Sequence, residues 1–144
     1  MQLHIQNEPD ARREDELYVL DQLKIHNSAH APVPFERLRL RLFARDENGT
    51  ILGGLVGSVT FHWLKIDILW VDEKCRGKHL GAKLVKEAER MAVEVGAHSA
   101  NVETTTFQAR PFYEKMGYEV FAELPDYPTG ASTFFLKKEG IGKK

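Results

Sequence analysis

The chain has 144 residues, 42% of them hydrophobic and 28% charged, which is the balance of a soluble globular protein with a sizeable core. Twenty basic residues against 21 acidic ones give a net charge of −1, so the chain lacks the basic excess typical of non-specific nucleic-acid binding. Its single cysteine, Cys75, excludes an internal disulfide and favours a reducing compartment, the cytoplasm.

The N-terminal residues lack the basic and apolar segments of a signal peptide, and no apolar run approaches the roughly 18 residues of a membrane span. We therefore expect neither a membrane nor a nucleic acid as partner. No repeat, linker or low-complexity segment divides the chain. The sequence predicts one α/β domain over residues 1–144, with a mobile polar tail over 137–144.

The first elements follow from hydrophobic periodicity. Alternation around Leu3 and Ile5 predicts a short opening strand, and helical spacing predicts a helix over 11–30. Leucine alternates with arginine over 37–42, which predicts a half-buried strand. An Asn48-Gly49 turn then leads into a return strand over 50–61.

Three glycines, Gly53, Gly54 and Gly57, lie inside that return strand. A dinucleotide fingerprint would need them between a strand and a helix, so that interpretation fails. Glycines within a strand more often mark a bulge or the close approach of another backbone.

The run over 63–71 is almost continuously apolar, which predicts a central strand covered on both faces. An amphipathic helix follows, with apolar residues at 80, 84, 88, 91 and 95, and Gly96 ends it. The later part of the chain predicts a strand over 98–105, a helix over 108–116, a strand from Tyr118, a loop over 125–130 and a last strand over 132–136.

The turn between the central strand and the amphipathic helix carries Arg76, Gly77, Lys78 and Gly81. Unpaired N–H groups and the positive end of the dipole at a helix start favour a bound anion, typically a phosphate. The alternative is a basic surface turn, and the stretch alone leaves both open.

Several other residues could carry chemistry. The pair Phe112-Tyr113 would normally pack in a core, but a tyrosine hydroxyl can also donate a proton. Asp67 and Glu103, with His62 behind them, lie in or beside strands that should be central, where carboxylates are rare unless paired or functional. The alternative is that each faces solvent. The spacing of the histidines and the single cysteine predicts no metal site.

With these elements in order, two motifs resemble the GNAT superfamily of acyl-CoA-dependent N-acetyltransferases. The family signature Arg/Gln-x-x-Gly-x-Gly/Ala corresponds to Arg76-Gly77-Lys78-His79-Leu80-Gly81, with His79 at the place of a glycine. A second family pattern, Asn-x-x-Ala-x-x-Phe/Leu-Tyr-x-x-x-Gly-Phe/Tyr, corresponds to residues 106–118, with Thr106 in place of the asparagine.

The resemblance covers nearly the whole chain and implies a fold of the α/β (α+β) class. The sheet would be mixed and mostly antiparallel, flanked by helices, with splayed central strands. It also implies acetyl-CoA as co-substrate, no metal, and Tyr113 as the acid that protonates the departing thiolate. Asp67 and Glu103 are then the candidate general bases. The implied cofactor-binding residues are Leu69, Trp70, Val71, Arg76, Gly77, Lys78, His79, Leu80, Gly81, Ala82, Thr106, Ala109 and Phe112.

We accordingly expect an N-acetyltransferase that transfers the acetyl group to a primary amine of a small molecule or peptide in a ternary complex. The alternative is an acyl-CoA sensor or interaction domain without turnover. The acceptor would be lined by the first helix and by the 32–35 and 125–130 loops. An exposed last strand would favour a homodimer.

Overall fold

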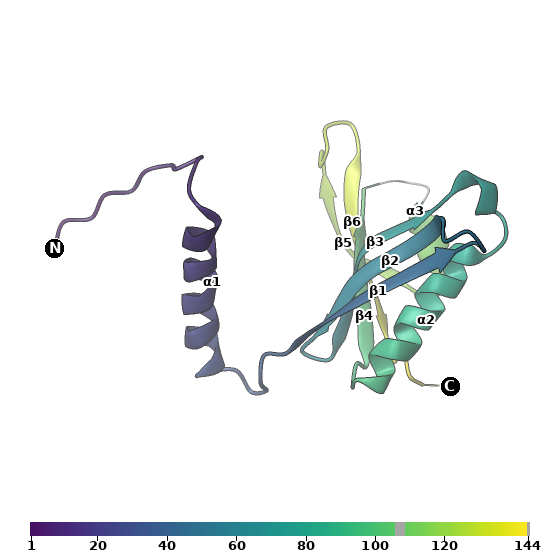
Figure 1. Cartoon of the computed structure of the whole chain (residues 1–144), viewed down its shortest axis with the longest axis horizontal. Coiled ribbons are helices and arrows are strands. Elements are labelled where there is room, and N and C mark those ends of the chain that lie inside the picture. The colour runs from purple at the N-terminus through teal and green to yellow at the C-terminus, as the bar shows by residue number, and fades with distance from the viewer. Residues whose placement is uncertain (106–108, 144) are drawn as a thin grey trace. The chain divides into compact units, whose positions relative to one another are not determined.

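The computed structural model describes residues 1–105 and 109–143 and divides into two compact units, Met1–Phe35 and Glu36–Lys144 (Figure 1). The larger unit holds every strand of the described chain. No helix of the described residues is long and apolar enough to cross a membrane.

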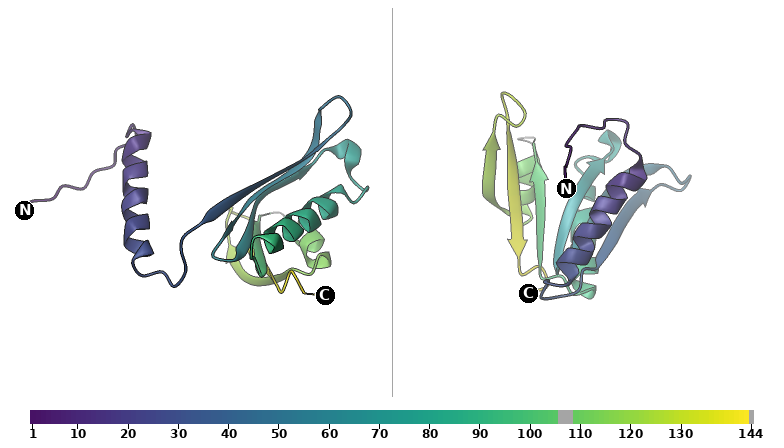
Figure 2. Two further views of the ribbon diagram at one scale, coloured as in Figure 1. Left: turned by 60° about the horizontal axis from the view of Figure 1, so that its bottom comes forward. Right: turned by 90° about the vertical axis from the view of Figure 1, so that its left-hand side faces the viewer.

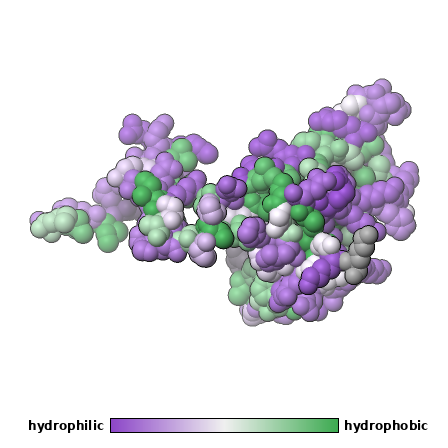
Figure 3. Space-filling view, turned by 90° about the horizontal axis from the view of Figure 1, so that it is seen from below, coloured by the Kyte–Doolittle hydropathy of each residue, from purple (hydrophilic) through white to green (hydrophobic). Residues whose placement is uncertain are grey.

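The first unit contains one helix, α1 (Arg13–Ser28), within the range that the sequence predicts. No residue of α1 is buried, and its exposed large side chains include Tyr18 and Ile25. Figure 3 shows hydrophobic residues, in green, among the hydrophilic ones on the surface of the N-terminal unit. The predicted opening strand is wrong, because residues 1–8 are without secondary structure. Alternation alone does not make a strand, since each strand needs a partner that pairs with its backbone.

The second unit is built on a six-stranded, mostly antiparallel sheet in the order β1-β2-β3-β4-β6-β5. Only the β3–β4 pair is parallel among the described pairings. This mixed sheet with flanking helices confirms the predicted fold class. The strands are β1 (Arg37–Arg45), β2 (Ile51–Thr60), β3 (Trp63–Val71), β4 (Ser99–Thr104), β5 (Glu119–Pro125) and β6 (Ser132–Glu139).

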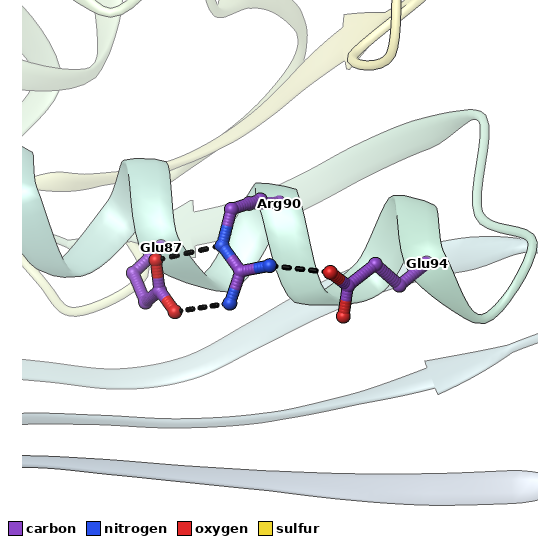
Figure 4. Close-up of polar contacts among 3 residues, drawn as sticks. All are labelled: Glu87, Arg90 and Glu94. Carbon is purple, nitrogen blue, oxygen red and sulfur yellow. Dashed lines mark hydrogen bonds and ion pairs between the residues drawn. The ribbon is translucent and has the colours of Figure 1, made fainter.

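Helix α2 (Leu80–Glu94) packs against β1, β2 and β3 (Figure 2). Of the predicted apolar stripe, Leu84 and Ala88 are buried and Leu80 and Met91 are partly buried, whereas Val95 is 48% exposed. Val85 and Ala92, outside the predicted stripe, complete the buried face of α2, which packs with Leu55, Leu64 and Ile66 of the sheet. On its exposed face, Arg90 pairs with Glu87 and Glu94, three residues before it and four after it (Figure 4). The short helix α3 (Ala109–Lys115) contributes Tyr113 to the same core.

The parallel pairing between β3 and β4 stops halfway along the two strands. It runs from Trp63 and Ser99 to Ile66 and Val102, although β3 continues to Val71 and β4 to Thr104. The right-hand view of Figure 2 shows the two strands separating. This splay leaves one backbone edge of β3 without a strand partner over its last residues, among those that the structure describes.

A β-bulge lies at the start of the splay. Val56 pairs with Ile68 and Gly57 pairs with Ile66, so Asp67 is an extra residue on β3. The bulge shifts the alternation of side chains by one residue. Leu64 and Ile66 are buried before it, and Leu69 and Val71 pack on the same core after it.

The bulge explains why the sequence of β3 is almost continuously apolar. The expectation that both faces of β3 are covered is wrong within this unit, because Ile68 and Trp70 are 57% and 47% exposed. Because the bulge shifts the core-facing positions by one residue, apolar residues follow one another in the sequence of β3. The resulting run resembles that of a strand buried on both faces.

The last strand, β6, ends at Glu139 instead of Leu136, so residues 137–139 of the predicted tail are part of the sheet. Glu119 pairs with Lys137, and Ser99 pairs with Glu139. The side chains at this end of β6 are all polar, because backbone pairing on both sides, and not hydrophobic burial, holds the strand in place.

We predict that Gly57→Ala destabilises the protein, because a Cβ atom at this position would overlap the carbonyl oxygen of Lys65 at the bulge. Such overpacking against backbone should lower the free energy of unfolding by about 3 kcal/mol, measured by urea denaturation. Gly49→Ala is the control, since Gly49 has a φ of 83° but nothing within 4 Å of the added atom. It should cost about 1 kcal/mol, and equal losses would contradict the role of Gly57.

Candidate active site

The turn after β3 is organised by backbone geometry. A 3-10 helix, η1 (Glu73–Cys75), begins at Asp72, whose side chain accepts a hydrogen bond from the Lys74 N–H at 2.9 Å. Gly77 and His79 then have φ values of 81° and 62°, in the left-handed region. His79 therefore adopts a conformation that glycine adopts most readily, which gives a physical reason for a glycine at this position in related sequences.

The N-terminus of α2 follows directly. Its N-cap residue, His79, makes no side-chain capping hydrogen bond, and the first turn contains no acidic residue. The first-turn N–H groups are thus without a carboxylate of their own helix, and they carry the partial positive charge of the helix dipole. This arrangement suits an external anion.

A cavity of about 560 Å³ lies at this turn. Its charged and titratable side chains include Arg76, His79 and Lys115, and no acidic residue lines it among those described. The cavity is therefore electropositive in character. It is lined by Leu69, Trp70, Val71, Cys75, Arg76, Gly77, His79, Leu80, Gly81, Ala82, Phe112, Lys115 and Met116.

The two sequence motifs meet at Gly81. A Cβ atom added there would lie 3.4 Å from the Phe112 ring and 3.7 Å from the Val71 side chain. The small residue thus lets the first turn of α2 approach α3 and the end of β3 closely. Residues about 30 positions apart in sequence therefore form one wall of the cavity.

A second cavity, of about 740 Å³, opens where β3 and β4 separate. Asp67 and Glu103 line it, and each lies one residue beyond Ile66 and Val102, the last residues that pair β3 with β4. Among the described residues, two acids and no basic residue line it, so the charge is opposite to that of the first cavity. The lining residues are Ile66, Asp67, Ile68, Leu69, Val102, Glu103, Thr104, Thr105, Ala109, Tyr113, Tyr127 and Pro128.

The two cavities adjoin at Leu69, which lines both. On the α3 side, Phe112 lines the electropositive cavity and Tyr113 lines the acidic one, with their ring centroids 5.1 Å apart. A molecule that extends from one cavity to the other would pass between β3 and these two rings.

Tyr113 is only 5% exposed, and this burial raises the pKa of its phenol to about 12. The group is therefore protonated throughout the physiological pH range and can act as a proton donor.

The loop between β5 and β6 forms another wall of the acidic cavity through Tyr127 and Pro128. The Tyr127 carbonyl accepts a 2.6 Å hydrogen bond from the hydroxyl of Thr133, and the Asp126 N–H donates to the Ala131 carbonyl at 2.8 Å. These bonds anchor the loop at its base, while the Tyr127 side chain is 58% exposed.

Most residues implied by the sequence motifs lie at these cavities. Lys78 is not among the lining residues, and Thr106 lies outside the described residues. His62 lies at the other end of β3, with its ring 6.2 Å from that of His98. In the electropositive cavity the additional lining residues are Cys75, Lys115 and Met116; the last two follow Phe112 by three and four positions, a helical spacing that could have identified them. In the acidic cavity they include Ile66, Ile68, Val102, Thr104 and Thr105.

Metal ligation has no support in the described part of the chain. No group of three or more His, Cys, Asp or Glu residues there could hold a metal ion. The chemistry available at the two cavities is that of an anion-binding turn, two carboxylates and a buried phenol.

Comparisons with known proteins agree with this geometry. The profile of the Acetyltransferase (GNAT) family matches residues 4–118. The chain is 46% identical over 98 residues to blasticidin-S acetyltransferase from Streptomyces morookaense, which covers 67% of this chain and 72% of that protein. An acetyltransferase from Agrobacterium fabrum is 30% identical over 128 residues, covering 89% of this chain and 93% of that protein.

Solved structures share the fold. The crystal structure of an acetyltransferase from Bacillus cereus ATCC 14579 matches with a TM-score of 0.83 and 33% sequence identity. The match covers 95% of this chain and 97% of that one.

We predict that the buried phenol of Tyr113 makes stability depend on pH above 10. The unfolded chain releases this proton near pH 10, whereas the folded chain keeps it until about pH 12. Between these values the free energy of unfolding should fall by about 1.4 kcal/mol per pH unit from this group, and below pH 10 the contribution is constant.

Because other groups also titrate there, the readout is the difference between wild type and Tyr113→Phe in urea unfolding. The stability advantage of wild type over the variant should shrink as the pH rises from 10 to 12. A difference that is independent of pH would contradict the raised pKa.

Proposed function

Because the chain belongs to the Acetyltransferase (GNAT) family, we propose that it transfers the acetyl group of acetyl-CoA to a primary amine of a small molecule or peptide. The observation that carries this proposal is the pair of adjoining cavities of opposite charge at the splayed end of β3. The electropositive cavity suits the phosphates of CoA, and the acidic cavity suits a cationic amine.

The cofactor would bind along β3 and the turn after it. The first-turn N–H groups of α2, with Arg76, would hold the pyrophosphate. The backbone edge of Leu69 to Val71, which β4 does not pair, would hold the pantetheine arm in the manner of an added strand. The same edge supports a role for a β3 N–H group in polarising the thioester carbonyl.

The reaction would proceed by direct attack in a ternary complex. The neutral amine attacks the thioester carbon, the carbon–nitrogen bond forms and the carbon–sulfur bond breaks. The nitrogen loses one proton and the sulfur gains one, so the transfer is neutral overall. Tyr113 would give the proton to the thiolate, and Asp67 or Glu103 would accept the proton of the amine, directly or through water.

The acidic cavity supports a preference for cationic acceptors. Asp67 and Glu103 stand at the mouth of the splay, and Tyr127 adds an aromatic surface that can bind a cation by its face. The relative from Streptomyces morookaense is named for an antibiotic, blasticidin S, which makes small-molecule amines the first acceptors to test.

Other expectations stay predictions. They are a single domain over residues 1–144, a homodimer, a cytoplasmic location, and a contribution of the first helix and the 32–35 loop to the acceptor site. In the structure that loop lines a hollow of its own unit, together with Lys24 and Ile25.

Thiol release from acetyl-CoA across a panel of primary amines tests the proposed function. We expect turnover. Thiol release should be faster with amines that carry a second positive charge than with amines of equal size whose remaining groups are uncharged. Acetyl-CoA at about a hundredfold over its dissociation constant should also add roughly 2.7 kcal/mol of stability. Binding without turnover of any amine would indicate a sensor, and the absence of any thermal shift would contradict cofactor binding itself.

Two single variants should separate chemistry from binding. Tyr113→Phe should lower kcat by about 10²–10⁴-fold, the usual contribution of a general acid, and leave the KM for acetyl-CoA within about twofold. Arg76→Glu should raise the Kd for CoA about tenfold, since the Arg76 side chain is exposed at the electropositive cavity. The kcat at saturating cofactor should then change little.

Steady-state kinetics and calorimetric titration with CoA measure the two effects. A Tyr113→Phe variant that turns over at the wild-type rate would remove Tyr113 as the acid. Unchanged CoA affinity in Arg76→Glu would remove its phosphate contact.

A further inference from the structure

Glu89 of α2 is a charged residue in the interior. It is 7% exposed, and it is the one Asp, Glu, Lys or Arg that is buried among the described residues. It lines neither cavity, so it cannot contact a molecule bound there directly. Burial of a carboxylate is costly unless its oxygens are paired, which directs attention to its partners.

Both carboxylate oxygens of Glu89 are engaged. The Tyr118 hydroxyl donates a 2.7 Å hydrogen bond to Oε2, and the Lys138 ammonium lies 3.0 Å from Oε1 and 3.3 Å from Oε2. The Lys138 nitrogen also lies 5.7 Å from the centre of the Tyr118 ring. The three side chains thus form a closed network in which every pair is in contact, and we call it the Glu89 network.

The Glu89 network joins three separate elements. Glu89 belongs to α2, Lys138 to β6, and Tyr118 to the short connection between α3 and β5. At Gly117, with a φ of 95°, an added Cβ atom would lie 3.4 Å from Cε of Lys138. The lysine stem therefore packs directly on the backbone where α3 ends.

Tyr118 transmits this anchoring to Tyr113. Its backbone N–H donates a 3.0 Å hydrogen bond to the Tyr113 carbonyl, and its ring meets the Tyr113 ring edge-on, with centroids 5.6 Å apart. Tyr118 is 3% exposed and Tyr113 is 5% exposed, so no solvent layer separates them. The position of the Tyr113 ring is thus coupled to the Tyr118 ring and backbone.

The described part of helix α3 has seven residues, and so short a stretch of helix depends on tertiary contacts for its stability. Its direction decides how the Tyr113 side chain lines the acidic cavity. A displacement of about 1 Å at a catalytic group can lower a rate about 10²-fold.

We propose that Glu89, together with Tyr118 and Lys138, positions the Tyr113 hydroxyl for proton donation by anchoring the end of α3 to α2 and β6. This inference rests on the proposed function and extends it to residues outside the two cavities. The three are positioning residues, because they act through Tyr113 and touch neither cofactor nor acceptor.

The test is a double-mutant cycle in the full chain, with Glu89→Gln and Tyr113→Phe alone and combined. Glu89→Gln keeps the size of the side chain and an acceptor for Tyr118 but removes the charge that pairs with Lys138. We expect kcat to fall about 10–100-fold while the KM for acetyl-CoA stays within about twofold. In the Tyr113→Phe background the same substitution should change kcat by less than about twofold.

The cycle distinguishes positioning from a general loss of structure. A merely structural role would lower kcat by the same factor in both backgrounds, and that additive result would overturn the proposal. Full activity of Glu89→Gln would overturn it as well. If wild type releases no thiol with any amine, the proposed function fails; if wild type turns over and the cycle is additive, only the positioning role fails.

Two further variants keep the test decisive. If Glu89→Gln does not fold, Glu89→Leu combined with Lys138→Met removes both charges at similar volume, a replacement that buried ion pairs often tolerate. The same non-additivity with Tyr113→Phe is expected. The matched control is Arg90→Gln, at the next position of α2, which breaks the exposed pairs with Glu87 and Glu94 (Figure 4) and should leave kcat within about twofold.

Discussion

The parallel pairing of β3 with β4 ends at Ile66 and Val102, and every feature of the candidate site is arranged around this interruption. The bulge at Asp67 coincides with it and shifts the side chains of β3 by one residue. Gly57 permits the bulge, since any side chain there would meet the Lys65 carbonyl. A glycine on the neighbouring strand thus permits the shift that determines which residues of β3 face the core.

Charge is divided between the two sides of the splay. Arg76, His79, Lys115 and the start of α2 make one cavity electropositive, whereas Asp67 and Glu103 make the other acidic. The chain as a whole has a net charge of only −1, so this separation is local and does not appear in the composition. In the proposed function, an anionic cofactor and a cationic acceptor would each enter the cavity of opposite sign and meet near Leu69 and Tyr113.

The described residues of helix α3 are too few to form a stable helix alone, and packing holds them on two sides. Phe112 packs on the first turn of α2 because Gly81 has no side chain, and Tyr113 packs on Tyr118, which Glu89 and Lys138 anchor. The same helix α2 therefore contributes to the anion-binding turn at its start and to the buried carboxylate further along. In the proposed function, cofactor binding and the position of the Tyr113 phenol would therefore both depend on α2.

Local patterns in the sequence were sufficient for most elements and for the turn after β3. The range of β3, the stripe of α2 and the turn residues Arg76 to Ala82 depend on interactions between residues near one another in the chain, so periodicity and glycine positions indicate them. The predictions of an opening strand, of burial on both faces of β3 and of the end of β6 were wrong or incomplete, because strand pairing is a contact between distant segments. Tertiary structure alone decided three matters. It brought Gly81 against Phe112, it made Asp67 a bulge residue at the mouth of the splay, and it paired Glu89 with Tyr118 and Lys138, residues 29 and 49 positions away. No local pattern predicts such contacts, since only the folded sheet and its helices determine which distant side chains become neighbours.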